Sequence, residues 1–205
     1  MLKDPIERNR KGIWAWPRSK WLLGIPLGGF IALGVGAGAM LGTGVAIEAT
    51  GTDSFCGTAC HSHQQFIDPE WKESVHYSNP AGVRAGCADC HIPSEYPDKL
   101  MVKAKAGIRD GYQEFIVGSI STRERYEGRR AELAEKVWAE MRANDSKACR
   151  TCHHVESFAD QSPRAERRHS RMAENDMTCI DCHEGVAHLS PAEAAKKYGG
   201  VADAR

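Results

Sequence analysis

One stretch near the N-terminus differs from the rest of the chain in its hydrophobic pattern. Residues 21–47 contain no charged side chain, which makes an uncharged run of 27 residues. A helix needs roughly 20 apolar residues to cross a bilayer. The apolar part of a cleaved signal peptide is only roughly 7–15 residues long. The pattern therefore predicts an uncleaved transmembrane signal-anchor helix over residues 21–47.

The charges beside this run predict its orientation. Six basic residues precede it: Lys3, Arg8, Arg10, Lys11, Arg18 and Lys20. Lys and Arg are enriched in the cytoplasmic flanks of membrane helices. Residues 1–20 are therefore predicted to form a cytoplasmic basic tail, and residues 48–205 to lie on the outer side of the membrane. Gly24 and Gly28 have a spacing that lets two helices approach closely, so a homo-oligomer through this helix stands beside the alternative of an ordinary Gly-rich anchor.

The exported part shows helical rather than strand-like patterning. Apolar residues recur at helical spacing after a capping-box pattern at 121–124; they are Leu133, Val137, Trp138 and Met141. They predict a long amphipathic helix ending near Arg142, preceded by another helix from about Pro97 to Gly118. No segment alternates convincingly as a strand, so the fold class is predicted to be mostly α. The Ala- and Lys-rich tail after Leu189 is expected to be peripheral.

Composition narrows the chemistry. Lys and Arg number 27 and Asp and Glu number 27, so no charge excess favours binding to nucleic acid. The 8 Cys form four pairs and none is left over. The pairs are Cys56/Cys60, Cys87/Cys90, Cys149/Cys152 and Cys179/Cys182.

A His directly follows the second Cys of every pair. These residues are His61, His91, His153 and His183. C-x-x-C-H is the attachment signature of c-type haem, in which two thiols bind the porphyrin and the His reaches the iron. A structural zinc site combines two separated ligand pairs and needs no His fused to each pair. The chain is therefore predicted to carry four covalent haems, although the first motif has three residues between its cysteines instead of two.

The motifs form an internal repeat. Cys56 and Cys87 are 31 positions apart, and Cys149 and Cys179 are 30 apart. The second motif of each half reads C-x-D-C-H. This self-similarity predicts two related di-haem halves, about 53–95 and 146–190, joined by a helical segment at 97–142. Little apolar sequence remains, so short helices and loops are expected to wrap a core made of haem.

The remaining His residues are candidates for the second axial position of each iron. They are His63, His76, His169 and His188, with His154 expected to be a bystander. His76 and His169 occupy equivalent places in the repeat. His188 follows His183 too closely to reach the far side of that haem, and suits a neighbouring haem. In the longer first motif, either His61 or His63 can be the ligand.

Several short stretches carry a resemblance to a known family. They are Ile47-Glu-Ala-Thr, Gly82-Val-Arg-Ala, Cys90-His91-Ile-Pro, Ala143-Asn-Asp-Ser-Lys-Ala-Cys149-Arg, Cys179-Ile-Asp-Cys-His183 and Val186-Ala-His188. Together they resemble the membrane-anchored tetrahaem quinol dehydrogenases of the NapC/NirT/NrfH type. The resemblance extends from the anchor to about Leu189. It implies a bacterial inner-membrane protein with its haem domain in the periplasm.

The resemblance also implies roles for individual residues. It suggests His76 as the distal ligand of haem four and His188 as that of haem three. For haem two, one branch of the family uses a Lys that matches Lys103, whereas the repeat offers His169. Asp110 matches an acidic residue near haem one and the quinol in relatives. Seven residues separate Lys103 from Asp110, so both lie on one helix face, and an exposed charge pair is the alternative.

Two departures from the family pattern concern the ligands. His63 takes the place of a Met that can ligate the first iron in relatives. Some relatives have a His three residues after the second motif, where this chain has Ser94.

The resemblance implies an activity and its partners. The family oxidises membrane quinol, either menaquinol or ubiquinol, and passes electrons to a periplasmic terminal reductase of the nitrate, nitrite or N-/S-oxide type. The alternative is an electron-relay anchor in the lipid bilayer that does not itself oxidise quinol. A terminal reductase with an open iron is disfavoured, because the His supply nearly saturates four irons.

We predict that the purified mature chain carries four covalent haems, because four motifs use all 8 Cys. Intact mass spectrometry measures this number directly. A mass corresponding to three haems, with Cys56 and Cys60 free, would show that the longer first motif is not attached.

Overall fold

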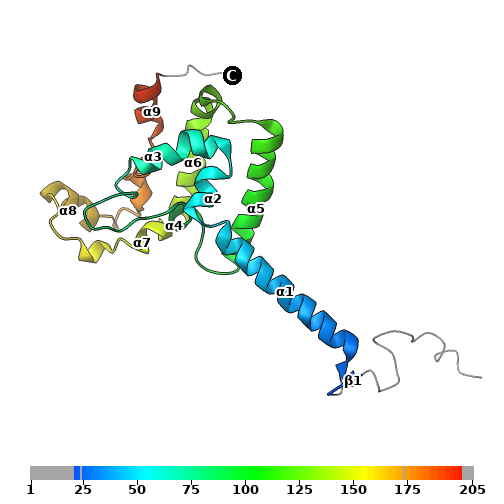
Figure 1. Cartoon of the computed structure of the whole chain (residues 1–205). Coiled ribbons are helices and arrows are strands. Elements are labelled where there is room, and N and C mark those ends of the chain that lie inside the picture. Colours follow the sequence, from blue (N-terminus) through cyan, green and yellow to red (C-terminus); the bar gives the residue numbers. More distant parts are fainter. Residues whose placement is uncertain (1–20, 24, 173, 200–205) are drawn as a thin grey trace, which may run out of the picture. The chain divides into compact units, whose positions relative to one another are not determined.

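The computed structural model describes residues 21–23, 25–172 and 174–199. The basic tail predicted for residues 1–20, and Gly24 of the Gly-x-x-x-Gly spacing, lie outside the described residues. The chain divides into two compact units, residues 1–49 and 50–205 (Figure 1).

The first unit contains a short hairpin and one long helix. Strands β1 (Trp21–Leu22) and β2 (Ile25–Pro26) pair antiparallel, and α1 follows at Leu27–Ala49. The helix therefore begins six residues later than the uncharged run. The cause is Pro26, because proline has no backbone N–H and disfavours helical geometry in the residue before it.

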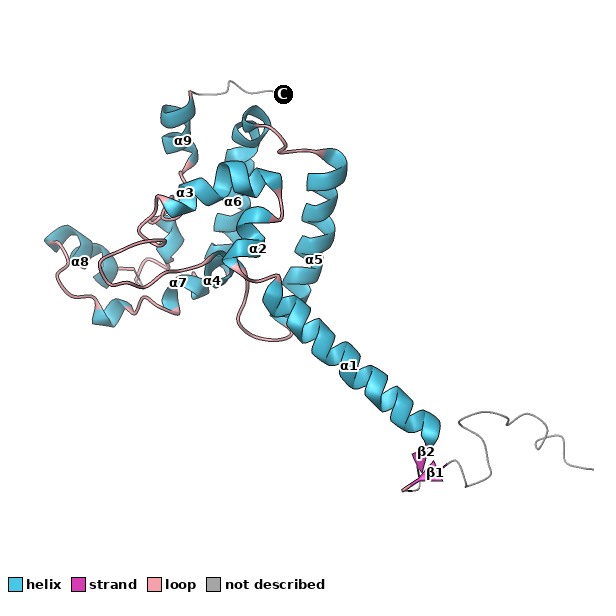
Figure 2. Ribbon diagram, in the orientation of Figure 1, coloured by secondary structure: helices cyan, strands magenta, loops and turns pink. Residues whose placement is uncertain are grey.

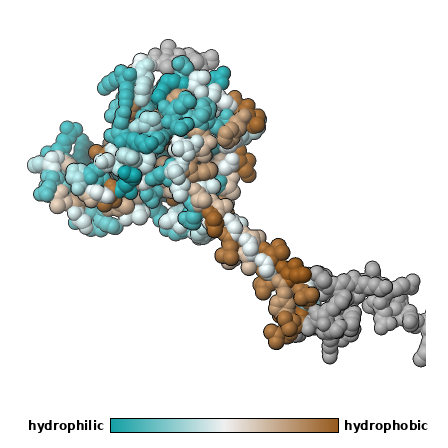
Figure 3. Space-filling view, viewed as in Figure 1, coloured by the Kyte–Doolittle hydropathy of each residue, from teal (hydrophilic) through white to brown (hydrophobic). Residues whose placement is uncertain are grey.

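Helix α1 retains the length that a membrane span requires. Its 23 residues give about 34 Å at 1.5 Å per residue, against a hydrocarbon thickness of roughly 30 Å. Among the described residues, it is the one helix long and apolar enough to cross a bilayer. Hydrophobic residues run along it in Figure 3.

The second unit is built from helices and turns, and its described residues contain no strand (Figure 2). This confirms the mostly-α fold class. The elements in order are α2 (Asp53–Thr58), η3 (His63–Ile67), α3 (Asp68–Lys72), α4 (Cys87–His91), α5 (Asp98–Tyr112), η4 (Gln113–Val117), α6 (Arg123–Ala143), α7 (Lys147–Arg150), η5 (Val155–Ser157), α8 (Pro163–Ser170), η6 (Cys179–Asp181) and α9 (Pro191–Tyr198). Turns η3 and η4 are π-helical, and η5 and η6 are 3₁₀ helices.

Both helices expected between the second and third motifs are present. Helix α5 continues into η4, and the pair ends at Gly118, whose φ of 62° is a left-handed conformation that glycine adopts without strain. Helix α6 begins one residue later than the capping pattern implied. Its N-cap is Thr122 rather than Ser121, because the Thr122 side chain accepts a hydrogen bond from the Arg125 N–H at 3.3 Å.

The second unit has a small apolar core. Its buried hydrophobic residues are Phe66, Trp71, Tyr126, Ile180 and Ala194. The rings of Phe66 and Tyr126 stack with centroids 5.6 Å apart. A soluble domain of this size normally buries many more apolar side chains than these. The small core fits a domain that folds around large prosthetic groups.

A buried charged cluster joins three distant segments. The Arg130 guanidinium of α6 donates to both carboxylate oxygens of Glu70 in α3, at 2.6 and 2.9 Å. It also donates to Glu127 one turn earlier. The backbone of Leu189 is bound from both sides, since its N–H donates to Glu70 at 3.1 Å and its carbonyl accepts from Arg130 at 3.0 Å. This cluster fixes the segment that carries His188.

The prediction that the tail after Leu189 is peripheral is wrong. Residues 191–198 form α9, which packs against α6 with Ala194 only 1% exposed. The Arg123 guanidinium lies 4.5 Å from the centre of the Tyr198 ring, and Lys197 bonds Glu73 at 2.7 Å. Composition does not predict this docking, because it depends on one small buried residue, Ala194, and one aromatic ring, that of Tyr198.

We expect Glu70→Gln to lower the free energy of unfolding by about 3 kcal/mol, because it leaves the Arg130 charge buried with one partner fewer. The side chains of Arg130 and Glu70 are only 5% and 2% exposed. Glu73→Gln is the matched control, since its pair with Lys197 is exposed and worth less than about 1 kcal/mol. Denaturant unfolding of the haem-loaded protein measures both. Equal losses would contradict a structural role for the buried pair.

Candidate haem-binding site

The four Cys-containing motifs lie on short helical elements of the second unit. Motif one begins in α2, motif two forms the whole of α4, motif three lies on α7 and the residues after it, and motif four begins with η6. All eight cysteines are free of disulfides. The thiols are therefore available for attachment to a prosthetic group.

Cys152 and Cys182 differ from the other six cysteines in being exposed, whereas the others are half-buried. Cys152 lies two residues after the end of α7, and Cys182 directly follows η6, so both stand in surface turns. Cys90, by contrast, lies inside α4 and is half-buried. Exposure leaves a thiol accessible for reaction.

The aspartate in each C-x-D-C-H motif caps the turn that carries it. Asp89 accepts a hydrogen bond from the Gly86 N–H at 2.7 Å. Asp181 accepts one from the Thr178 N–H at the same distance. These bonds satisfy an N–H that a helix start otherwise leaves unpaired.

A second pair of matching contacts links the two motifs of each half. Asp53, three residues before Cys56, accepts from the Cys87 N–H at 2.9 Å. Ser146, three residues before Cys149, accepts from the Ile180 N–H at 3.2 Å. A Cβ at Gly86 would lie 2.3 Å from the Asp53 carboxylate, so this approach requires glycine. Sequence reasoning missed Asp53 and Ser146, although their shared offset from a cysteine was a usable signal.

The first thiols of the two motifs in each half are neighbours. A hydrogen bond with Cys87 lowers the pKa of the Cys56 thiol to about 7, while burial opposes the shift and Lys103 adds to it. Cys179 lies beside Cys149, whose thiol pKa is raised chiefly by burial. The attachment points of the two motifs therefore lie side by side.

Three pairs of imidazole rings face each other at nearly one separation. The ring centroids are 6.2 Å apart for His76 and His153, 6.3 Å for His91 and His188, and 6.1 Å for His169 and His183. A metal bound between two imidazoles, with metal–nitrogen bonds of roughly 2 Å, separates their centroids by about 6 Å. Each pair joins a motif His to one from elsewhere in the chain. The residues therefore fit haem iron with two axial His ligands.

The surroundings of these rings leave a nitrogen for a metal. His76 Nδ1 bonds the Val186 carbonyl at 3.1 Å, and His169 Nδ1 bonds the Gln161 side chain. Such bonds orient a ligating His and leave Nε2 for the metal. Within the described part of the chain, Nδ1 of His188 is buried without a hydrogen-bond partner.

Desolvation also holds two of these rings in the neutral form that binds metals. Burial lowers the pKa of His188 to about 4, with the adjacent His91 adding to the effect. Desolvation by the surrounding protein, aided by the nearby His63, lowers the pKa of His91 as well. In the described residues, no cluster of three or more His, Cys, Asp or Glu side chains could hold a metal ion by itself.

The observed pairs differ from those that the family resemblance implied. His76 faces the third motif, where the resemblance placed it at haem four. His188 faces the second motif, where the resemblance placed it at haem three. His169, which the internal repeat had offered to haem two, faces the fourth motif. The pairings of His76 and His188 depend on contacts between segments far apart in the sequence, which motif spacing does not encode.

The two His residues of the first motif have different surroundings. His61 uses both ring nitrogens, since Nδ1 lies 2.6 Å from Glu114 and Nε2 lies 3.0 Å from the Ser121 carbonyl. These contacts raise the pKa of His61, the Ser121 carbonyl most of all. His63 bonds the Cys56 carbonyl through Nδ1 at 2.8 Å. Among the described residues its Nε2 makes no hydrogen bond, so this nitrogen is available.

Glu114 is a site residue that sequence reasoning missed. Its carboxylate is 5% exposed and accepts from the Ser62 N–H and hydroxyl at 3.2 and 2.8 Å. Burial opposes ionisation, but the bonds from Ser62 and His61 lower the pKa of Glu114. No motif or spacing predicts this contact, because Ser62 and Glu114 are 52 positions apart in the sequence.

Lys103 and Asp110 lie on the helix beside the first motif. Lys103 Nζ donates to Thr50 Oγ1 at 2.9 Å and acts electrostatically on Cys56. The pKa of the Cys60 thiol is raised mainly by burial, and the negative charges of Glu114 and Asp110 raise it further. The half-exposed Asp110 carboxylate accepts from Arg109 at 2.6 Å. Helix α5 therefore brings both predicted residues to motif one.

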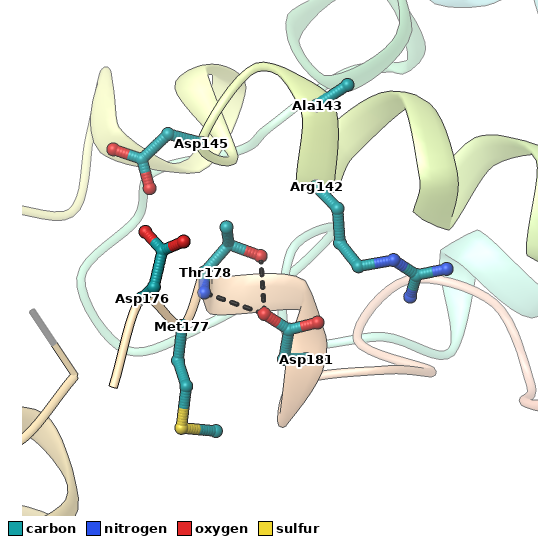
Figure 4. Close-up of a pocket in the computed structure, with 7 residues that line it drawn as sticks. All are labelled: Arg142, Ala143, Asp145, Asp176, Met177, Thr178 and Asp181. Carbon is teal, nitrogen blue, oxygen red and sulfur yellow. Dashed lines mark hydrogen bonds between the residues drawn. The ribbon is translucent and has the colours of Figure 1, made fainter.

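An open hollow of about 350 Å³ lies beside the fourth motif (Figure 4). It is lined by Arg142, Ala143, Asp145, Asp176, Met177, Thr178 and Asp181. Figure 4 shows the Thr178 backbone and hydroxyl bonding Asp181 at its edge. Three carboxylates and an arginine make this lining polar, so it does not suit an apolar substrate.

Comparison with known proteins relates most of the chain to one family. Residues 18–193 match the model of the NapC/NirT cytochrome c family, N-terminal region. The chain is 43% identical over 196 residues to the denitrification system component NirT of Stutzerimonas stutzeri, covering 92% of this chain and 94% of the relative. No solved structure matches the chain significantly.

Two further relatives differ in how much of their length is matched. The cytochrome c-type protein NapC of Paracoccus pantotrophus is 39% identical over 194 residues, which cover 87% of this chain and 79% of the relative. The cytochrome c-type protein TorC of Escherichia coli K12 is 46% identical over 149 residues. Those residues cover 72% of this chain but 37% of TorC.

Proposed function

Since this chain belongs to the NapC/NirT cytochrome c family, we propose that it oxidises membrane quinol and passes the electrons to a periplasmic reductase in anaerobic-type respiration. The observation that carries the proposal is the set of three imidazole pairs at 6.1–6.3 Å, each beside a C-x-x-C-H motif. Haem supplies one-electron carriers at these positions. The protein supplies attachment, axial ligands and a surrounding of low polarity.

Four covalent haems are proposed, one for each motif. Each haem is attached by the cysteine pair of its motif, and these pairs include the exposed Cys152 and Cys182. The three ring pairs supply axial ligands for three of the haems. His91 and His188 serve the second haem. His153 and His76 serve the third, and His183 and His169 the fourth. Lys103 is then not needed as an iron ligand, which agrees with its bond to Thr50.

His63 is proposed as the axial ligand of the first haem. Its Nε2 is available, and its Nδ1–H bond to the Cys56 carbonyl is the usual support for a ligating His. His61 is turned toward Glu114 and Ser121, with both nitrogens engaged. The extra residue between Cys56 and Cys60 explains the displacement, because it moves His61 relative to the attached sulfurs.

Quinol oxidation is proposed to take place beside motif one, at Lys103 and Asp110. Oxidation releases two protons for every two electrons, so a base is needed near the quinol. The half-exposed Asp110 carboxylate can accept a proton as a general base. Lys103 can hold a quinone oxygen by donating a hydrogen bond from Nζ.

The alternative function is an electron-relay anchor beside which another subunit oxidises the quinol. The position of Lys103 and Asp110 next to motif one favours direct oxidation. Turnover of a quinol analogue by the purified chain, without partners, tests this. A chain that accepts electrons from a soluble reductant but not from the analogue would be a relay.

The membrane setting completes the proposal. Helix α1 anchors the chain in the inner membrane, with residues 1–20 in the cytoplasm and the haem unit in the periplasm. The donor is menaquinol or ubiquinol, and the acceptor is a reductase of the nitrate, nitrite or N-/S-oxide type. The relatives NirT, NapC and TorC support the class of partner without selecting one of these reductases.

We expect His63→Ala to change the spin state of one haem, because it removes the proposed ligand of the first iron. His61→Ala is the matched control and should leave the spin states unchanged. Electron paramagnetic resonance and carbon monoxide difference spectra of haem-loaded variants measure this. A spin change in His61→Ala alone would reverse the assignment.

We expect Asp110→Asn to slow quinol oxidation by about 10²-fold or more, the usual contribution of a general base. Reduction by a small soluble reductant should be unaffected, since it bypasses the quinol. Asp98→Asn, in the first turn of the same helix, is the control. If Asp110 is only an exposed charge on the helix, turnover of a quinol analogue should change less than about twofold, a barrier change under roughly 0.5 kcal/mol.

A further inference from the structure

Helix α5 and its extension η4 expose large apolar side chains to solvent. The exposed fractions range from 43% for Leu100 to 78% for Ile108. The others in this set are Met101, Tyr112, Phe115, Ile116 and Val117. Hydrophobic residues gather along one edge of the second unit in Figure 3.

These side chains form one stripe along the helix. They recur at intervals of three or four residues, from Leu100 and Met101 through Ile108 and Tyr112 to Phe115, which places them on one face. Ala104 continues the stripe and is also exposed. The stripe is about 24 Å long at 1.5 Å per residue.

The opposite face of α5 is polar and is turned toward the first motif. Lys103 reaches Thr50 and acts on Cys56, Asp110 acts on Cys60, and Glu114 is buried against Ser62. A surface helix of a soluble protein has the reverse arrangement, with its apolar stripe toward the core. An apolar environment outside this unit must therefore cover the stripe.

The position of α5 in the chain identifies that environment as lipid. Helix α1 ends at Ala49, and the next residue, Thr50, accepts the hydrogen bond from Lys103. One residue spans at most about 3.6 Å, so the amino-terminal half of α5 is held close to the point where the chain leaves its membrane helix. Exposed Lys105 borders the stripe, and a Lys there can place its amine among anionic headgroups.

We propose that α5 and η4 lie in the plane of the bilayer interface, with the apolar stripe among the acyl chains. The chain then contacts the membrane twice, once through α1 and once through this amphipathic helix. The proposal depends only on the membrane anchor and on the exposed stripe. It holds whether or not the chain oxidises quinol.

Photo-crosslinking of the full-length, haem-loaded protein tests the proposal. The probe is p-benzoylphenylalanine, introduced as Ile108→p-benzoylphenylalanine in vesicles of phosphatidylethanolamine and phosphatidylglycerol. We expect lipid adducts by mass spectrometry. Leu33 of α1 is the positive control position, and exposed Ala131 of α6 is the negative control. Intact mass verifies the haem count of each variant.

Three outcomes would overturn the proposal. One is the absence of lipid adducts at position 108 while position 33 forms them. Another is an equal adduct yield at positions 108 and 131, which would show that labelling does not distinguish faces. The third is crosslinking of position 108 to a second copy of the chain, which would make the stripe a protein interface.

A second variant tests the stripe as a whole. With the probe at Phe115→p-benzoylphenylalanine, Ile108→Glu should lower the lipid adduct yield about tenfold, since burying one large aliphatic side chain is worth roughly that factor. Ala131→Glu in the same background is the control. An unchanged yield with Ile108→Glu, in a protein with full haem content, would show that the helix does not dock as a unit.

Discussion

The separation between paired imidazole rings is the constraint on which the second unit depends. Three pairs stand 6.1–6.3 Å apart, and in two of them, His76 with His153 and His91 with His188, the members come from distant parts of the chain. Holding them there requires the surrounding elements to be fixed, and the few buried apolar residues cannot do this alone. The buried Glu70–Arg130 pair contributes by binding both backbone groups of Leu189, next to His188. Such a pair costs desolvation energy, so its value lies in positioning as much as in stability.

Local features of the fold could be predicted from the sequence, and long-range ones could not. The membrane helix, the helices around 98–117 and 123–143, and the attachment motifs follow from periodicity and spacing. The start of α1 at Leu27 was also readable, because Pro26 already excludes an earlier start. By contrast, the docking of α9 and the pairing of His188 with His91 arise from contacts across long stretches of sequence. The role of Glu114 at His61 has the same origin.

Helix α5 connects two chemical environments. Its polar face reaches the first motif through Lys103, Asp110 and Glu114, and its apolar face is exposed. The distance between an apolar substrate in the bilayer and the first electron acceptor can then be as short as the width of this one helix, about 10 Å. The short connection from Ala49, where α1 ends, to Thr50, which accepts a hydrogen bond from Lys103, fits this role. The hollow beside the fourth motif lies on a different part of the unit and has the polar lining of a solvent-facing site.

The pairing of His91 with His188 has a consequence for how the protein matures. The two residues are 97 positions apart in the sequence. With the proposed topology, in which the haem unit follows an N-terminal anchor into the periplasm, His91 would arrive there before His188. On the proposed assignment, the second centre stays open on one face until nearly the whole chain has been exported. A chain broken off after the fourth motif would carry every attachment cysteine and still have an incomplete second centre. On this assignment, completion of the second centre requires the segment that carries His188 as well as the four motifs.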